Sequence, residues 1–158
     1  MSDLTHVGTD GRARMVDIAA KPETERMAEA VGQVRMRAST LQALTSGQSP
    51  KGDLLRTAEI AGIMAAKRAG ELIPLCHPLA LSGVWVTAVA NPDLPGIEIS
   101  AIAKTVGRTG VEMEALAAVS IACLTVYDMA KAIDHDLVIE RIELVSKSGG
   151  RSGDWRRA

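Results

Sequence analysis

The sequence predicts an α+β fold of the ferredoxin-like split βαβ type, a sandwich in which one antiparallel sheet carries two long helices on one face. Three observations predict it. Segment 54–70 places apolar residues at helical spacing, and segment 110–133 is Ala-rich and apolar on most faces, so both are expected to be helices. Two β-branched segments, 84–90 and 97–103, are close enough in the chain to form a hairpin. One further strand is expected before these segments and one after, which gives the order strand, helix, strand, strand, helix, strand.

The first elements are a short strand over 13–18, ended by Lys21 and Pro22, and a longer segment over 23–37. Ala and Glu in the longer segment favour a helix by propensity. However, its side chains alternate between two sets, and Gly32 at its centre disfavours a helix, so the pattern favours a strand.

A short helix is expected over 39–44 with Ser39 as its N-cap, followed by a loop over 45–52. Asp53 is placed to cap the first long helix, and Gly70 is placed to end it.

Residues 91–96 join the two hairpin strands. The helix that follows, from Gly110 to about Ile133, is apolar on most faces, which indicates burial against the sheet and against a second subunit. Residues 137–145 form the last strand of the fold.

The chain of 158 residues fits one domain with a single core. A flexible N-terminal arm over about 1–12 and a mobile basic tail over about 148–158 are expected at its ends. Ile139, Val145 and Trp85 leave the sheet face opposite the helices partly apolar, and oligomerisation is the simplest way to cover it.

Composition argues against several function classes. The net charge of −1 creates no field that attracts nucleic acid or a membrane surface, and two Trp, one Tyr and no Phe give few platforms for stacked bases. The two cysteines, Cys76 and Cys123, lie outside any CxxC motif, which argues against a disulfide framework and a structural zinc site. The polar N-terminus and the lack of a membrane-spanning apolar run predict a cytoplasmic protein.

The motif LIPLCHPL (72–79) places Cys76 and His77 between two prolines. Proline fixes the backbone, which suits a rigid edge of a ligand site, where His77 would donate a hydrogen bond or shuttle a proton. The alternative is a helix end with an ordinary loop histidine, and Cys76 fits a small buried side chain better than a nucleophile.

The motif TGVEMEAL (109–116) opens the second long helix. Thr109 as N-cap and Glu112 three residues later match a capping box. Glu114 is not explained by the cap. Two carboxylates beside a helix N-terminus are also placed to bind the N–H groups of a purine-like edge.

The motif VYDMAKA (126–132) places Asp128 and Lys131 on one helix face. One interpretation is a surface ion pair worth only about 0.2–0.5 kcal/mol. The other is an acid/base couple, which requires burial or nearby cations to depress the lysine pKa. The apolar helix makes burial plausible, and both interpretations stay open from the residues alone.

Two further lysines, Lys51 and Lys147, fit phosphate binding and also fit ordinary solvated side chains, whereas Lys67 has only the ordinary interpretation of a helix end. Lys51 follows a Pro in a flexible loop, Lys147 precedes Ser-Gly-Gly, which can bring backbone N–H groups to an anion, and Lys67 ends a helix where positive charge suits the dipole.

Taken together, the motifs resemble those of cyclic pyranopterin monophosphate synthases in content, order and spacing over nearly the whole chain. The matching segments are MVD (15–17), KGD (51–53), IAGIMAAKR (60–68), LIPLCHPL (72–79), TGVEMEAL (109–116), VYDMAKA (126–132) and SKSGG (146–150). Arg151 departs from the pattern, because lysine often follows SGG in that family. This difference would affect the binding of phosphate at most and not the reaction.

The resemblance implies a phosphorus–oxygen lyase of molybdenum cofactor biosynthesis that converts a cyclised dihydroguanosine triphosphate into cyclic pyranopterin monophosphate and pyrophosphate. It implies a hexamer, a trimer of dimers with sites at the subunit interface, and no cofactor or protein-bound metal, with magnesium on the triphosphate left open. Asp128 takes the catalytic acidic role, and Lys51 and Lys131 take acid/base and phosphate roles. The implied substrate-binding residues are Leu75, Cys76, His77, Met113 and Glu114, with weaker transfers to Glu112, Lys67 and Lys147.

Two other functions remain compatible with the residues. The first is a non-catalytic ferredoxin-like module that binds a small ligand, since fold alone does not fix function. The second is an enzyme that forms a Schiff base through Lys131 or Lys51.

Overall fold

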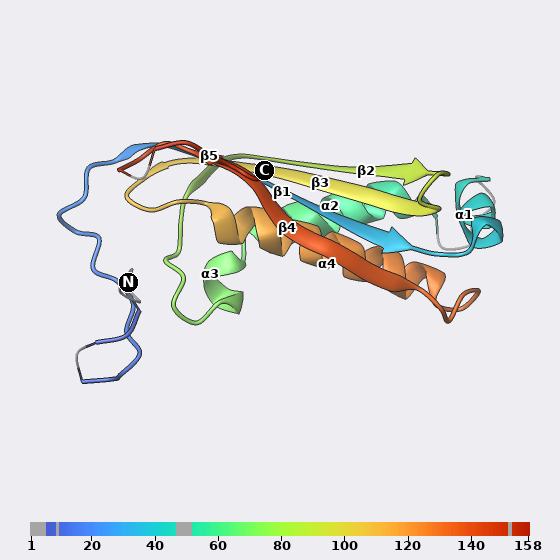
Figure 1. Cartoon of the computed structure of the whole chain (residues 1–158), viewed down its shortest axis with the longest axis horizontal. Helices are drawn as coiled ribbons and strands as arrows, with labels where there is room; N and C mark the ends of the chain where they lie inside the picture. Colours follow the sequence, from blue (N-terminus) through green and yellow to red (C-terminus); the bar gives the residue numbers. More distant parts are fainter. Residues whose placement is uncertain (1–5, 9, 47–51, 152) are drawn as a thin grey trace.

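The computed structural model describes residues 6–8, 10–46, 52–151 and 153–158 (Figure 1). Its elements are β1 (Thr24–Arg35), α1 (Ala38–Thr45), α2 (Leu54–Ala66), α3 (Ala69–Leu72), β2 (Leu81–Asn91), β3 (Gly96–Gly107), α4 (Glu112–Ala130), β4 (Val138–Ser148) and β5 (Trp155–Arg156).

The five strands form one antiparallel sheet in the order β2-β3-β1-β4-β5. Helices α2 and α4 pack against each other and cover the same face of the sheet (Figure 1). The predicted ferredoxin-like split βαβ sandwich is therefore confirmed. Strand β5, which pairs with the outer edge of β4, comes from the C-terminal segment for which the sequence predicts no strand.

The alternation in β1 places small residues against α4. Ala28, Ala30 and Val34 are fully buried on the helix side of the sheet. A Cβ on Gly32 would lie 2.5 Å from Val119 Cγ1 and 3.0 Å from Cys123 Sγ, so only glycine allows the helix to approach this closely. The predicted strand over 23–37 is confirmed, and its glycine is explained by packing.

Helix α4 is the one described helix that is long and apolar enough to cross a membrane by length and composition. Here it packs along β1, β3 and β4 and against α2, with eight of its residues buried. Its apolar character is therefore that of a core helix.

Some local expectations from the sequence are wrong. Residues 13–18 form no strand, because Ala13 makes only an isolated bridge to Val7. Ser39 does not cap α1, whose N-cap is Arg37 without a side-chain hydrogen bond. Gly70 does not end the first long helix, because α2 stops at Ala66 and Gly70 lies within α3.

Hydrogen bonding, exposure and strand pairing decide three other expectations. Asp53 caps α2 as predicted, since its carboxylate accepts a hydrogen bond from the Arg56 backbone N–H at 3.1 Å. Trp85 is exposed on the sheet face opposite the helices, as predicted. Ile139 is not on that face, because it pairs with buried Val34 and packs against the core under the helices.

Candidate functional site

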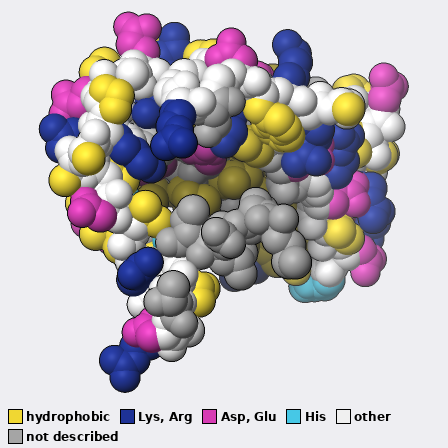
Figure 2. All heavy atoms as spheres, turned by 60° about the vertical axis from the view of Figure 1, so that its left-hand side comes forward, with side chains coloured by type: hydrophobic (Ala, Val, Ile, Leu, Met, Phe, Trp, Pro, Cys, Tyr) yellow, Lys and Arg dark blue, Asp and Glu magenta, His cyan; other side chains and the backbone are white. Residues whose placement is uncertain are grey.

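A pocket of about 750 Å³ opens at one end of the sandwich, where the start of β1, the turn from β3 to α4 and the end of β4 meet. Basic side chains from all three regions and one carboxylate line it. These are Lys21, Arg26, Arg108, Lys147 and Arg151, together with Glu112. Figure 2 shows this end of the molecule as a hollow with Lys and Arg side chains around its rim.

The sheet register assembles this pocket. Strand β1 lies between β3 and β4, so that Thr24 pairs with Gly107 and Ala28 pairs with Lys147. Arg26, between those two positions, therefore meets the turn that holds Arg108 on one side and the end of β4 on the other.

Gly149 and Gly150 allow the end of β4 to lie directly on β1. Both have positive φ angles, +90° and +76°. A Cβ on Gly149 would collide with the Glu25 carbonyl oxygen, and one on Gly150 would collide with the Arg26 guanidinium. The predicted use of this glycine pair for anion binding is not seen at Gly149, whose N–H donates to Asp154 Oδ1 at 3.3 Å.

Two buried polar atoms in the pocket wall lack a hydrogen-bond partner within the described chain. They are Arg26 Nε and Thr24 Oγ1. A buried polar group without a partner costs roughly 1–3 kcal/mol, so it calls for an explanation such as a ligand or water. Both atoms are compatible with a phosphate oxygen, because one is a cationic donor and the other a hydroxyl.

Glu112 begins α4 and forms an ion pair with Lys147, with Lys147 Nζ 2.9 Å from Glu112 Oε1. The predicted capping box is wrong. The N-cap of α4 is Val111, which makes no side-chain capping bond, and Thr109 lies in the turn before it. The Glu112 side chain is consequently available to the pocket rather than to the helix backbone.

Glu114 and Cys76 join the two most specific motifs. Glu114 is 2% exposed, and Cys76 Sγ donates to its Oε1 at 3.8 Å. Glu114 Oε2 is buried and accepts no hydrogen bond from any described residue. Burial raises the pKa of the Glu114 carboxyl. Burial and then the nearby Glu114 charge raise the pKa of the Cys76 thiol, which disfavours the nucleophilic thiolate form.

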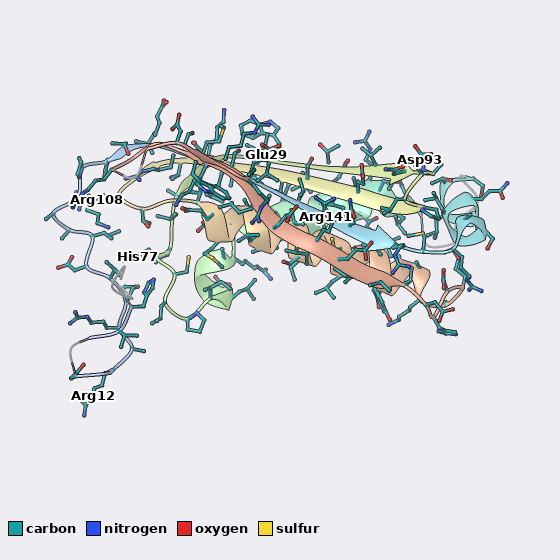
Figure 3. The ribbon with its side chains drawn as sticks, viewed as in Figure 1. Arg12, Glu29, His77, Asp93, Arg108 and Arg141 are labelled. Atoms are coloured by element: carbon teal, nitrogen blue, oxygen red, sulfur yellow. The ribbon has the colours of Figure 1, made fainter. Side chains whose placement is uncertain are left out.

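The other residues of these motifs lie beside that contact. Leu75 and His77 are half-buried, and Met113 is 37% exposed at the start of α4. Figure 3 shows His77 at the same end of the molecule as Arg108, whereas Asp93 lies at the other end.

Asp128 and Lys131 lie at the other end of α4. Lys131 Nζ is 2.7 Å from Asp128 Oδ1, with side-chain exposures of 57% and 67%. The expected burial of Lys131 is wrong for the single chain. A hydrogen bond to Asp128, and then the negative charge of Asp128, raise the pKa of Lys131. An acid/base couple was expected to require a lowered lysine pKa.

The single chain therefore does not bring the predicted site residues together. Glu114 and Asp128 are fourteen positions apart on one continuous helix, which at about 1.5 Å per residue separates them by about 21 Å. Lys67 is exposed at the C-cap of α2, apart from the pocket wall. Lys51 lies outside the described residues.

The sequence does not predict Lys21, Arg26 or Arg108 as site residues. Arg26 falls within a strand and Arg108 within a turn, where basic residues are ordinary, so composition carries no signal for either. Only the residue-by-residue pairing of β1 with β3 and β4 brings them together. The predicted order of the strands does not give that pairing. Among the described residues, no group of three or more His, Cys, Asp or Glu side chains is placed to hold a metal ion.

Known proteins match the chain over nearly its full length. The model of the MoaC family matches residues 15–150. The chain is 60% identical over its whole length to the cyclic pyranopterin monophosphate synthase of Novosphingobium aromaticivorans, of which it covers 99%. It is 62% identical to the synthase of that name from Roseiflexus sp. strain RS-1, over 98% of both chains. It is 57% identical, over 99% of its length, to that of Thermomicrobium roseum, of which it covers 95%. The chain therefore belongs to the MoaC family.

Proposed function

We propose that this chain is a lyase of molybdenum cofactor biosynthesis that converts 3',8-cyclo-7,8-dihydro-GTP into cyclic pyranopterin monophosphate and pyrophosphate. The shared name of its full-length relatives supports this activity over the small-ligand-binding module. The structural observation that carries the proposal is one pocket lined by five basic side chains in a chain of net charge −1.

The basic pocket would hold the phosphate groups of the substrate. Lys147, Arg26 and Arg108 approach it from three different elements, so that phosphate oxygens placed between them would be stabilised from several sides. The unpartnered Arg26 Nε and Thr24 Oγ1 would each donate a hydrogen bond to a phosphate oxygen when the ligand enters. We propose that these cations assist the departure of pyrophosphate, and that the protein needs no resident cofactor or metal ion of its own.

The purine-derived part of the substrate would lie toward Glu114, Cys76 and His77. A buried carboxylate oxygen without a partner is suited to accept an N–H group of a guanine-like ring. The Cys76 thiol donates to the other oxygen of the same carboxylate and so restrains its orientation. Leu75 and Met113 would supply apolar contacts on either side.

The acid/base groups would be Asp128 and Lys131, with Lys51. Because the end of α4 lies about 21 Å from Glu114 in one chain, we propose that a second subunit supplies them and that the site is shared across a dimer interface. Entry into that interface would remove water from the Lys131–Asp128 pair and so change the pKa of Lys131, which Asp128 raises in the single chain. We propose a cytoplasmic hexamer built as a trimer of such dimers.

The experiment is to incubate the purified protein with the cyclised dihydroguanosine triphosphate and to measure pyrophosphate and the pterin product. The proposal expects both products in equal amounts. Substrate that binds but is recovered unchanged would instead support the non-catalytic module. Borohydride added during turnover should trap no adduct on the protein, and a trapped lysine adduct would identify the Schiff-base enzyme.

A further inference from the structure

A buried carboxylate that takes no part in the proposed chemistry lies just beyond α4. The Asp134 side chain is fully buried. Its Oδ2 accepts hydrogen bonds from the Arg37 backbone N–H at 3.0 Å and from Thr40 Oγ1 at 2.8 Å. Its Oδ1 accepts one from the Asp136 backbone N–H at 3.0 Å and lies 3.2 Å from Arg37 Nε. Each carboxylate oxygen thus has two donors.

The backbone of the same residue is bonded to α4. The Asp134 N–H donates to the Ala130 carbonyl oxygen at 3.2 Å, as the Ile133 N–H does at 3.0 Å. The Arg37 guanidinium closes the network by donating from Nη2 to the Ile133 carbonyl oxygen at 2.8 Å. Asp134 therefore ties the last turn of α4 to the junction between β1 and α1, more than ninety positions away in the sequence.

The turn held in this way is the one that carries the exposed Lys131–Asp128 pair. Lys131 is the C-cap of α4, and a helix end frays unless its last carbonyl groups find partners. We propose that Asp134 is a positioning residue, which fixes this turn against the sheet so that Lys131 and Asp128 are presented in a single geometry. The inference rests on the proposed function, because that function assigns chemistry to the pair.

The test compares Asp134→Asn with Asp136→Asn, the same change on an exposed side chain two residues away. Pyrophosphate release gives kcat and KM, and NMR titration of the Lys131 side chain gives its pKa. Displacement of a reacting group by about 1 Å costs up to about 100-fold in rate, so Asp134→Asn should lower kcat roughly 10- to 100-fold. Its KM should stay near the wild-type value, and the Lys131 pKa should move toward its ordinary value. Asp136→Asn should match the wild type in all three.

A folded Asp134→Asn protein with wild-type kcat and Lys131 titration would overturn the proposal, even if its melting temperature fell. If Asp134→Asn does not fold, Thr40→Val removes one donor at nearly constant volume and should shift the Lys131 titration in the same direction by less. An unchanged titration in that variant would also overturn the inference. If the wild type releases no pyrophosphate, the proposed function fails, and the Lys131 titration decides the positioning role without it.

Discussion

Glu114 and Asp134 are both buried carboxylates, and their surroundings shift their pKa values in opposite directions. Hydrogen bonds from the Arg37 backbone and three further donors hold the pKa of Asp134 below its usual range. Burial raises the pKa of Glu114, and one of its oxygens has no partner in the described chain. A fully bonded carboxylate is what a scaffold requires, whereas an incompletely bonded one is suited to a ligand.

Glu114→Gln should stabilise the ligand-free protein at neutral and alkaline pH. Because the folded pKa is raised, the unfolded chain ionises first, and the folded protein loses stability as the pH rises above about 4.3. The variant lacks this loss. Urea unfolding from about pH 4 to about pH 8 should therefore show an advantage over the wild type that grows with pH. The exposed Glu71→Gln control should show none. An advantage independent of pH would contradict the role of ionisation.

Asp134 should contribute the opposite pH dependence. Its folded pKa is lowered, so its contribution to stability is fully present above the unfolded value of about 3.9 and is lost as the pH falls below it. Between about pH 6 and about pH 2.5, the wild-type free energy of unfolding should fall more steeply than that of Asp134→Asn. Parallel curves for the two proteins would show that Asp134 is not the group responsible.

Lys51→Ala, Asp128→Ala and Lys131→Ala should each lower pyrophosphate release by about 100-fold or more, since acid/base groups typically contribute that much. Asp128 and Lys131 are exposed in the single chain and lie outside its core, so their loss should leave the fold of the subunit intact. Steady-state kinetics and urea unfolding measure the two effects. Near-normal release by all three variants would refute the catalytic assignment.

At the scale of elements, α4 serves the core with its middle and the proposed chemistry with its two ends. Its first turn carries Glu112, which lines the pocket, and the buried Glu114, and its last turn precedes Lys131. The middle packs on three strands and α2, which is why the helix is apolar on several faces. A rigid helix of this kind fixes its two functional ends relative to each other.

The end of β4 depends on glycine at two successive positions. Gly150 has a φ of +76°, and a Cβ there would displace the Arg26 guanidinium. Gly150→Ala should cost about 1–3 kcal/mol in strain and should raise KM more than it lowers kcat, because the added Cβ deforms the proposed phosphate-binding pocket. Gly153→Ala, also at positive φ but with no atom within 4 Å of the added Cβ, is the matched control. It should be destabilised without the rise in KM.

Periodicity and turn residues predict which helices and strands form better than they predict the residues at which these begin and end. The alternation of β1 was readable because its buried face is built entirely from small or branched residues, Ala28 to Val34. The cap at Thr109 was wrong because local pattern could not show that Glu112 pairs with Lys147, a residue of another strand. The motif residues of the site were predicted from the resemblance, and the Cys76–Glu114 contact brings two of those motifs together.

The basic pocket could not be predicted, because no segment of the sequence contains it. Arg26, Arg108 and Lys147 become neighbours only when β1 pairs with β3 on one edge and with β4 on the other. Register of this kind depends on packing of the whole sheet, which a short sequence pattern does not determine.

At the scale of the whole molecule, both faces of the sandwich leave large apolar side chains exposed. Trp85, Val89 and Val106 lie on the strands, and Ile60 and Leu124 lie on the helices. A trimer of dimers requires two different interfaces on each subunit, whereas a simple dimer requires one. Apolar surface on both faces therefore agrees with the proposed hexamer.

The proposed shared site leads to a complementation test. Each site would combine the pocket of one subunit with the α4 end of its partner. Glu114→Ala and Asp128→Ala proteins should both be inactive alone. A mixed dimer of the two would hold one site with both changes and one site with neither. Random co-assembly makes half of the dimers mixed, so activity should return to roughly a quarter of the wild-type value.

The matched control mixes Asp128→Ala with Lys131→Ala. Both residues come from the same end of α4, so every site in a mixed dimer lacks one of them, and no activity should return. Activity that returns only in the mixture of Glu114→Ala with Asp128→Ala therefore shows that the site is shared between subunits. Activity that returns in both mixtures would show that co-assembly itself restores it. Native mass spectrometry verifies that mixed oligomers have formed. If verified mixtures of Glu114→Ala and Asp128→Ala stay inactive, both residues act from one chain, and α4 would have to bend to bring its ends together, for which Val111–Ile133 contains no Pro or Gly.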